Sequence, residues 1–153
     1  MFADGCVLKD GATISIALQR SDKNHLVKFL ECIKADSNYP IKEYDVKFNG
    51  KVYKAVKITL YSRKLWNDLI SLGCIPCKSL VLKPPKIDLK FANHFCRGYF
   101  DGDGSVSFNE TTETSQVSVV GTKDLLEYVK INSGISDIRI TLNQKGNNIT
   151  HSL

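Results

Sequence analysis

The chain opens with alternating apolar and polar positions, a pattern typical of half-buried β-strands. Ile14, Ile16 and Leu18 alternate with small or polar residues. Asp10-Gly11 precedes this run, and such a pair favours a tight turn between two antiparallel strands. We therefore predict a first hairpin, with its strands at residues 5–9 and 12–20.

A second hairpin has the strongest turn signal in the chain. Asn49-Gly50 stands between two alternating runs, and Asn-Gly suits the type I′ turn that joins twisted strands. Tyr44, Val46 and Phe48 share one face of the first arm, and we expect this face to be buried and Lys47 to point outward. The predicted arms are Glu43–Phe48 and Lys51–Tyr61.

Apolar residues at helical spacing predict helices after both hairpins. Ser21 or Asp22 is placed to cap the first of them, and Gly73 to end the second. Pro84-Pro85 then marks a boundary, because proline cannot donate a backbone hydrogen bond and disfavours helix before it. The predicted helices are the segment with Leu26, Phe29, Leu30 and Ile33, then residues 63–72, and Asp88–Asp101 beyond the boundary.

The same order of elements then begins again, which indicates an internal repeat. Ala3–Val7 matches Gly102–Val106, and Asp22–Asn24 matches Thr122–Asp124. We predict two domains, residues 1–83 and 84–153. Each would contain a helix, two strands, a helix, two strands and a helix. The opening helix of the first domain is mostly missing, as are the last strand and helix of the second. The repeat predicts strands at Val106–Phe108, at Val117–Val119, at Ile138–Leu142 and from Ile149, and a helix over 122–132 capped by Thr122.

Composition indicates a folded globular chain. Of the 153 residues, 42% are hydrophobic and 24% charged, which excludes wholesale disorder. No apolar run approaches the roughly 18 residues that a membrane span needs, and no signal peptide is visible. Five cysteines are an odd count, and because no signal peptide is visible we expect reduced thiols and a cytoplasmic (intracellular) protein. Because no apolar run is long enough to span a membrane, we expect no membrane partner.

Charge is distributed unevenly along the chain. Residues 1–100 hold 17 Lys and Arg against 9 Asp and Glu, a net charge of +8. Residues 101–153 hold 4 against 7, a net charge of −3. The basic first two thirds permit a nucleic-acid partner, but they also fit an ordinary solvated surface.

One motif changes this picture. The segment Cys96–Gly104, with the sequence CRGYFDGDG, resembles the motif of the LAGLIDADG homing endonuclease family, and Met1–Gly5 resembles the end of that motif. The resemblance covers nearly the whole chain as two repeats. It implies an α+β fold of two pseudo-symmetric αββαββα halves, both incomplete here, whose antiparallel sheets form a DNA-binding saddle. It also implies that two motif helices pack side by side, with Gly98 allowing close approach.

The resemblance implies a site-specific, metal-dependent endonuclease that cuts double-stranded DNA. Asp4 and Asp103 match the catalytic and metal-binding carboxylates of the two motifs, and Gly5 and Gly102 belong to the same metal site. Hard oxygen ligands of this kind suit Mg²⁺, which activates water and stabilises the leaving oxygen of a phosphodiester. Lys78 would stabilise phosphate charge, although a surface lysine in a linker would look the same in the sequence.

The exposed sheet faces would then contact DNA. The outward positions carry hydroxyl, amide and cationic groups, which suit base edges and phosphates, although an ordinary solvated sheet face remains the alternative for them. These positions are Ser15, Gln19, Lys47, Lys57, Thr59, Ser107, Gln116, Ser118, Arg139 and Thr141.

Other interpretations of the same residues are weaker. An EF-hand loop starting at Asp101 would need glycine and glutamate where Val106 and Thr112 stand. Cys74 and Cys77 have zinc-ligand spacing, with His94 and Cys96 further along the chain, but the small apolar site in the motif favours packing for Cys96.

Two alternatives concern the whole chain. It could be a catalytically degenerate remnant or a DNA-binding protein of the same fold. An intein endonuclease is less favoured, because the end His151-Ser-Leu153 does not match the His-Asn end that splicing uses. Without a full first motif helix, the Phe91, Phe95 and Tyr99 face would be left without cover, so we predict a possible homodimer through the Asp88–Asp101 helix.

Overall fold

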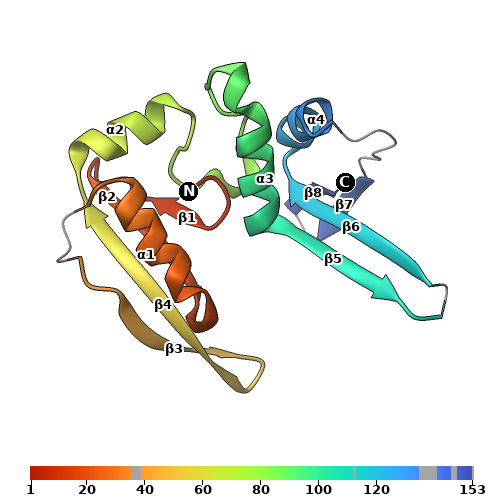
Figure 1. Ribbon diagram of the computed structural model, residues 1–153, viewed down its shortest axis with the longest axis horizontal. Helices are drawn as coiled ribbons and strands as arrows, with labels where there is room; N and C mark the ends of the chain where they lie inside the picture. The colour runs from red at the N-terminus through yellow and green to blue at the C-terminus, as the bar shows by residue number, and fades with distance from the viewer. Residues whose placement is uncertain (36–38, 112, 135–140, 146–147, 153) are drawn as a thin grey trace. The chain divides into compact units, whose positions relative to one another are not determined.

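The chain forms two compact units, each built on one antiparallel sheet. The computed structural model describes residues 1–35, 39–111, 113–134, 141–145 and 148–152, with side chains up to residue 134. Met1 and Ala3–Asp68 form unit 1, and Phe2 and Leu69–Leu153 form unit 2. The strand orders are β1-β2-β4-β3 in unit 1 and β5-β6-β8-β7 in unit 2 (Figure 1).

Unit 1 begins with the hairpin expected from the sequence. The Asp10 carboxylate accepts hydrogen bonds from the backbone N–H groups of Ala12 and Thr13, at 3.0 and 2.8 Å. Hydrogen bonds from Thr13, first from its side chain and then from its backbone, and one from Ala12 hold the pKa of Asp10 below its usual value. The elements of unit 1 are β1 (Gly5–Val7), β2 (Thr13–Gln19), a 3-10 turn (Arg20–Asp22), α1 (Lys23–Cys32), β3 (Lys42–Phe48), β4 (Lys51–Tyr61) and most of α2 (Arg63–Ser71).

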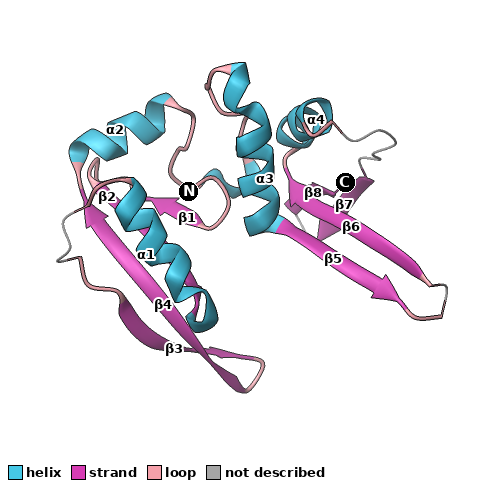
Figure 2. Cartoon of the chain, viewed as in Figure 1, coloured by secondary structure: helices cyan, strands magenta, loops and turns pink. Residues whose placement is uncertain are grey.

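The second hairpin is also confirmed. Asn49 and Gly50 have φ values of 49° and 75°, the positive pair that a type I′ turn requires. The tip of the hairpin β3–β4 continues beyond the first turn of α1 (Figure 2), and β3 is exposed along its whole length.

The core of unit 1 lies between α1 and the sheet. Leu26 of α1 packs on Ile16, Val56 and Ile58, all nearly fully buried. Burying one such leucine contributes about 1.5–3 kcal/mol to folding. The predicted capping bond at the start of α1 is wrong, because the side chain of the N-cap residue Asp22 makes no capping hydrogen bond.

Unit 2 repeats the plan with a full motif helix. The Asp88 carboxylate accepts a hydrogen bond from the backbone N–H of Lys90 and starts a 3-10 turn that leads into α3. The helix continues two residues beyond the predicted end, to Asp103. The elements of unit 2 are short 3-10 turns at Lys78–Leu80 and Leu89–Phe91, α3 (Ala92–Asp103), β5 (Gly104–Asn109), β6 (Thr114–Gly121), α4 (Lys123–Asn132), β7 (Thr141–Lys145) and β8 (Asn148–Ser152).

Thr122 caps α4 as expected, since its side chain accepts a hydrogen bond from the backbone N–H of Leu125. Its hydroxyl also donates to the carbonyl of Leu82, which ties the segment before α3 to unit 2. Of the predicted late strands, Leu142 lies in β7 and Ile149 in β8. Ile138 and Ile140 lie outside the described residues.

The segment between α2 and α3 belongs to unit 2. Gly73 ends α2 with a φ of 97°, and the backbone N–H of Lys86 donates to the carbonyl of Leu72 at 2.9 Å. Cys74 is fully buried within this segment. The domain boundary after residue 83 stays a prediction from the sequence. None of the helices in the described ranges is long and apolar enough to cross a membrane.

Candidate nucleic-acid interface

Asp103 is the last residue of α3 and is half-buried. Tyr99, one helical turn earlier, is 4% exposed, and its hydroxyl donates to the backbone carbonyl of Val120 at 2.9 Å. Burial raises the pKa of Tyr99 well above its usual value, and the Asp103 carboxylate raises it further by its charge and by hydrogen bonding. The structure therefore sets this carboxylate beside a neutral phenol that also contacts β6.

Gly104 follows Asp103 and begins β5. A Cβ at this position would lie 2.3 Å from the carbonyl oxygen of Phe100 and 2.6 Å from its ring. Both distances are too short for real carbon contacts, and one of them is to backbone. Only glycine lets the chain turn from α3 into the strand here.

The same steric arrangement appears at Gly5, the first residue of β1. A Cβ there would lie 2.6 Å from the Cα of Met1 and 2.7 Å from its carbonyl oxygen. In both units, therefore, a Cβ on the glycine would overlap the residue four positions before it. Asp4, the counterpart of Asp103, is exposed and follows three residues that form no helix. The two units thus share the arrangement at the glycine, whereas the described residues before Asp4 do not form a helix like α3.

The aromatic side of α3 packs inside unit 2. The Phe95 ring stacks on Tyr99 with ring centres 6.0 Å apart and meets Tyr128 of α4 edge-on at 5.9 Å. The expectation that Phe91, Phe95 and Tyr99 form one face without cover is therefore wrong for Phe95 and Tyr99. Phe91 alone stays half exposed, at 51%.

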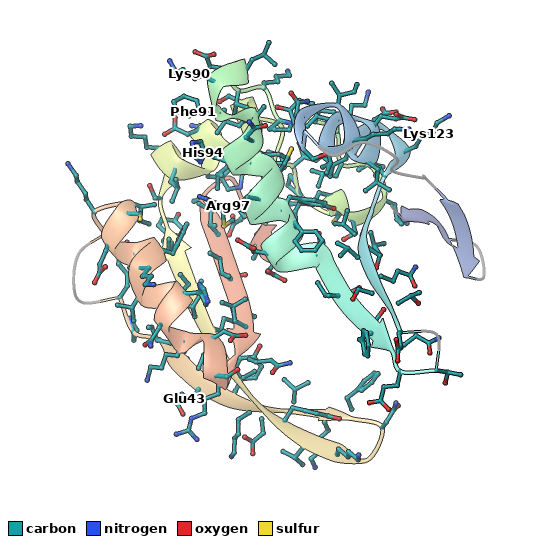
Figure 3. All side chains as sticks on the ribbon, turned by 45° about the vertical axis from the view of Figure 1, so that its right-hand side comes forward. Glu43, Lys90, Phe91, His94, Arg97 and Lys123 are labelled. Atoms are coloured by element: carbon teal, nitrogen blue, oxygen red, sulfur yellow. The ribbon has the colours of Figure 1, made fainter. Side chains whose placement is uncertain are left out.

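Another side of α3 carries polar and cationic groups. Figure 3 shows Lys90, Phe91, His94 and Arg97 following one another along this helix and the turn before it. His94 and Arg97 are exposed, and the Lys90 ammonium lies 5.0 Å from the centre of the Phe91 ring. Gly98 is also exposed, with no atom within 4 Å of a Cβ built there.

Strand register decides which side chains share the outer face of the sheet in unit 1. Ser15 pairs with Thr59, Ala17 with Lys57 and Gln19 with Ala55, and paired residues lie on the same face. The core residues Ile16, Val56 and Ile58 lie on the other face, under α1. The predicted DNA-contact residues of β2 and β4 therefore do share one outer face. Ser15 is 8% exposed, so it is the least accessible of them.

Lys47 lies on the wrong face for that prediction. It pairs with Val52, and this pair lies on the helix side of the sheet, together with Asp45–Lys54 and Glu43–Val56. Two ion pairs confirm the orientation. Asp45 meets Lys54 at 2.8 Å, and Glu43 meets Lys23 at the start of α1 at 3.1 Å. The alternation of β3 was identified correctly, but the face on the helix side and the outer face were exchanged.

Because the two faces of β3 are exchanged, residues that were not predicted to contact DNA lie on the outer face. Tyr44, Val46 and Phe48 lie on the outer face with Lys57, and so does Lys51 through its pairing with Phe48. Alternation in one strand does not reveal which of its faces meets the helix when the partner strand has apolar residues on both faces, as β4 does. The missing information is the register of β3 on β4, which the Asn49-Gly50 turn could have supplied.

In unit 2 the outer face of β5–β6 is neutral and polar. Ser107 pairs with Gln116, and Ser105 with Ser118, whose hydroxyls lie 2.8 Å apart. These residues alternate with Val119, which is buried on the helix side. The three predicted contact residues of these strands thus share one face. Arg139 lies outside the described residues, and only the backbone of Thr141 is described, at the start of β7.

Lys78 begins the 3-10 turn after Cys77 and is half-buried. Cys77 is exposed with a φ of 55°, whereas Cys74 and Cys96 are buried. Burial raises the pKa of the Cys96 thiol, which fits packing rather than metal binding. Across the described ranges, no three His, Cys, Asp or Glu side chains are grouped to hold a metal ion, so the zinc interpretation gains no support.

The end of α3 offers Mg²⁺ a different set of donors. A helix leaves its last carbonyl groups without an intrahelical partner, which applies to Gly102. A carboxylate and a carbonyl are both hard oxygen donors, and Mg²⁺ commonly takes one or two carboxylates with waters and phosphates completing its shell. Asp103 and Gly102 therefore fit Mg²⁺ in the kind of ligand that they present.

Comparison with known proteins identifies the fold. No protein-family model and no curated protein matches the chain. Among solved structures it is similar to the homing endonuclease I-WcaI bound to its DNA recognition sequence, with a TM-score of 0.61, 13% identity, and coverage of 99% of this chain and 70% of that one.

The chain is also similar to DUF199/WhiA. For the full-length protein from Thermatoga maritima the TM-score is 0.54 at 15% identity, and the match covers 99% of this chain but 46% of that protein. For the N-terminal LAGLIDADG domain of DUF199/WhiA the TM-score is 0.56 at 15% identity, with 99% and 68% covered. At these identities the likeness concerns the fold, and the chain has the α+β, antiparallel-sheet architecture of the LAGLIDADG homing endonuclease-like fold.

Proposed function

We propose that the chain is a site-specific double-stranded DNA endonuclease that uses Asp4, Asp103 and Mg²⁺ to hydrolyse phosphodiester bonds. The observation that carries this proposal is the repeated geometry of the two motif ends. In both units an aspartate precedes a glycine that has no room for a Cβ, and this glycine begins the first strand of a four-stranded sheet. Such a repeat suits a duplex, whose two strands each need a carboxylate.

The residues have separate roles in this proposal. Asp103, with the carbonyl of Gly102, would hold one ion, and Asp4 with Gly5 would serve the other DNA strand. When bound, Mg²⁺ supplies an activated water and charge neutralisation at the leaving oxygen. The neutral phenol of Tyr99 lies beside Asp103 and would orient its carboxylate. Lys78 would contribute positive charge toward phosphate.

The outer sheet faces would bind the duplex. Lysines on the outer face of unit 1 suit phosphates, and hydroxyl and amide groups on both faces suit base edges in the major groove. The positive excess over residues 1–100 adds a long-range attraction to DNA.

Cleavage of a randomised duplex library tests the proposal. We expect cuts with Mg²⁺ that cluster on one sequence, and binding without turnover with Ca²⁺. Asp103→Asn should lower the cleavage rate by at least about 100-fold, since even an outer-shell partner of a metal is worth 10–100-fold. Asp101→Asn removes an exposed carboxylate from the same helix and serves as the matched control. Equal loss in both variants, or Mg²⁺-independent cutting, would contradict these assignments.

A second candidate is a DNA-binding protein of the same fold that does not cut. The exposure of Asp4 favours it, because Asp103 by contrast is half-buried at the end of α3, beside Tyr99. Selective binding of one duplex with no Mg²⁺-dependent cleavage, and equal affinity in wild type and Asp103→Asn, would establish this candidate in place of the first.

A further inference from the structure

The hairpin β3–β4 carries its apolar side chains on the face that points away from the helix of its own unit. On the helix side stand charged residues in ion pairs, such as Asp45 with Lys54. On the outer face, four apolar or aromatic side chains keep between 39% and 64% of their surface exposed. They are Tyr44, Val46, Phe48 and Tyr53, and we call them the hairpin apolar strip.

This distribution is the reverse of what folding alone favours. A strand that packs under a helix normally turns its apolar face toward that helix, because apolar burial stabilises the fold. The core of unit 1 uses Val56 and Ile58 in this way. The strip therefore contributes little to the core of unit 1, and its four members lie next to one another in two paired strands.

Cations accompany the strip on the same face. Lys51 pairs with Phe48, and Lys42 pairs directly with Lys57. Two like charges opposite each other on a sheet destabilise it, and an anionic partner relieves that cost. The partner that fits this face is therefore both anionic and apolar at its centre.

A DNA major groove meets both requirements. Phosphates line its rims, and the 5-methyl groups of thymines project from its floor as the only apolar groups that a base pair presents there. We propose, on the basis of the DNA-binding function proposed above, that the hairpin apolar strip reads thymine methyl groups while Lys42, Lys51 and Lys57 hold the flanking phosphates.

Unit 2 differs in this respect. Strands β5 and β6 contain no charged residue, and their outer face carries hydroxyl and amide groups, as at Ser107, Asn109 and Gln116. These groups hydrogen-bond to base edges and do not depend on a methyl group. The half-site contacted by unit 1 should therefore be sensitive to thymine methyls, and the half-site contacted by β5–β6 should not.

The test replaces thymine by uracil, which removes the methyl group and leaves base pairing intact. A duplex selected from a randomised library in Ca²⁺ is resynthesised with deoxyuridine in one half at a time, and equilibrium binding of the full chain is measured. In one half we expect affinity to fall about four-fold for each methyl that the strip buries. In the other half we expect little change.

Two matched pairs of variants assign the effect to the strip. Val46→Ser should weaken binding to the thymine duplex and reduce the sensitivity to uracil, because it removes the apolar groups of one of the four strip residues, while Val52→Ser, on the opposite face of the same hairpin, should leave both unchanged. Lys57→Gln should reduce the slope of log affinity against log salt by about 0.9, the value for one lost phosphate contact, and Lys47→Gln should not.

The outcomes separate this inference from the proposed function. If no duplex is selected, the DNA-binding function itself fails. If a duplex is selected but uracil changes nothing in either half, or its effect is as large in Val46→Ser as in wild type, the strip does not read thymine and the inference is overturned while the function stands.

Discussion

The two motif ends, Ala3–Gly5 in unit 1 and Gly102–Gly104 in unit 2, share one steric solution and differ in what supports it. Both glycines lie where a Cβ would overlap the residue four positions earlier. Asp103 ends a helix of 12 residues whose rings pack on α4, whereas Asp4 is exposed after three residues without helical structure. The comparison shows that the turn into the first strand has the same local steric requirement in both units, whereas only Asp103 ends a described helix and has a buried tyrosine beside it.

The largest expected effect comes from replacing the glycine that the two motif ends share. Gly104→Ala places a Cβ 2.3 Å from the Phe100 carbonyl oxygen, so α3 and β5 must separate. We expect about 3 kcal/mol of destabilisation, at the upper end for overpacking, and a comparable loss for Gly5→Ala. Urea unfolding monitored by circular dichroism measures both. If either alanine is tolerated within 0.5 kcal/mol, that glycine is not required by steric fit, and the equivalence of the two motif ends is wrong.

A smaller effect removes the support that only unit 2 has. Tyr99→Phe loses the hydrogen bond to the Val120 carbonyl and leaves that acceptor without its partner, which costs about 1–2 kcal/mol. We expect lower stability in urea at neutral pH, and slower cleavage if the phenol orients Asp103. Tyr61→Phe, at an exposed tyrosine of unit 1, is the control.

Alkaline pH tests the same residue by a different route. The pKa of Tyr99 is raised in the folded state, so the folded protein holds this proton more tightly than the unfolded chain does. Its contribution is complete below the ordinary tyrosine pKa of about 10 and is lost as the pH rises above it. We therefore expect wild type to lose stability more steeply than Tyr99→Phe above about pH 10. Parallel curves would show that Tyr99 titrates normally.

Much of the fold followed from the sequence, because turns and alternation act over short distances. Asn49-Gly50 and Thr122 predicted a hairpin and a helix start that the structure confirms. The face of β3 did not follow, since alternation gives two faces but the register on β4 decides which one meets α1. For the same reason Lys47 was assigned to the outer face, and Tyr44, Val46 and Phe48 to the opposite one.

The candidate site was also predicted in part. The sequence predicted the motif helix over Asp88–Asp101, and the structure confirms the helix but extends it to Asp103, because helical spacing defines a helix better than it defines its last residue. The packing of Phe95 on Tyr99 and on Tyr128 was missed, since helical spacing shows which residues share a face but not what covers it. The catalytic, metal-binding and DNA-binding roles of the site residues stay predictions.

A substitution at Gly98 tests whether a second copy of the chain covers the exposed side of α3. A Cβ at Gly98 meets nothing within 4 Å, and alanine is favoured over glycine within a helix by about 1 kcal/mol. We expect Gly98→Ala to stabilise the chain by 0.5–1 kcal/mol in urea unfolding. If two copies instead paired through this face, the added methyl would separate the helices. A concentration-dependent loss of stability in this variant would therefore support the homodimer through the Asp88–Asp101 helix.

The smallest expected effect concerns the ion pairs that connect the start of α1 to the sheet in unit 1. In unit 2, the Tyr99 hydroxyl connects a helix to its sheet instead. Glu43 meets Lys23 at 3.1 Å and Arg20 at 3.3 Å, all on exposed side chains. The hydrogen bond from Lys23, and then the charge of Arg20, hold the pKa of Glu43 below its usual value. The stabilisation is therefore present above the ordinary glutamate pKa and is lost as the pH falls through the lowered value.

Glu43→Gln should be only slightly less stable than wild type at pH 7 and low salt, because water and salt screen exposed pairs. The difference should disappear in 1 M salt, where the Debye length is about 3 Å, and also below the acid transition of Glu43. Glu127→Gln, on the exposed side of α4, is the control. A Glu43 effect that survives both high salt and acid would mean that this side chain acts by packing, and α1 would then be held to its sheet without help from charge.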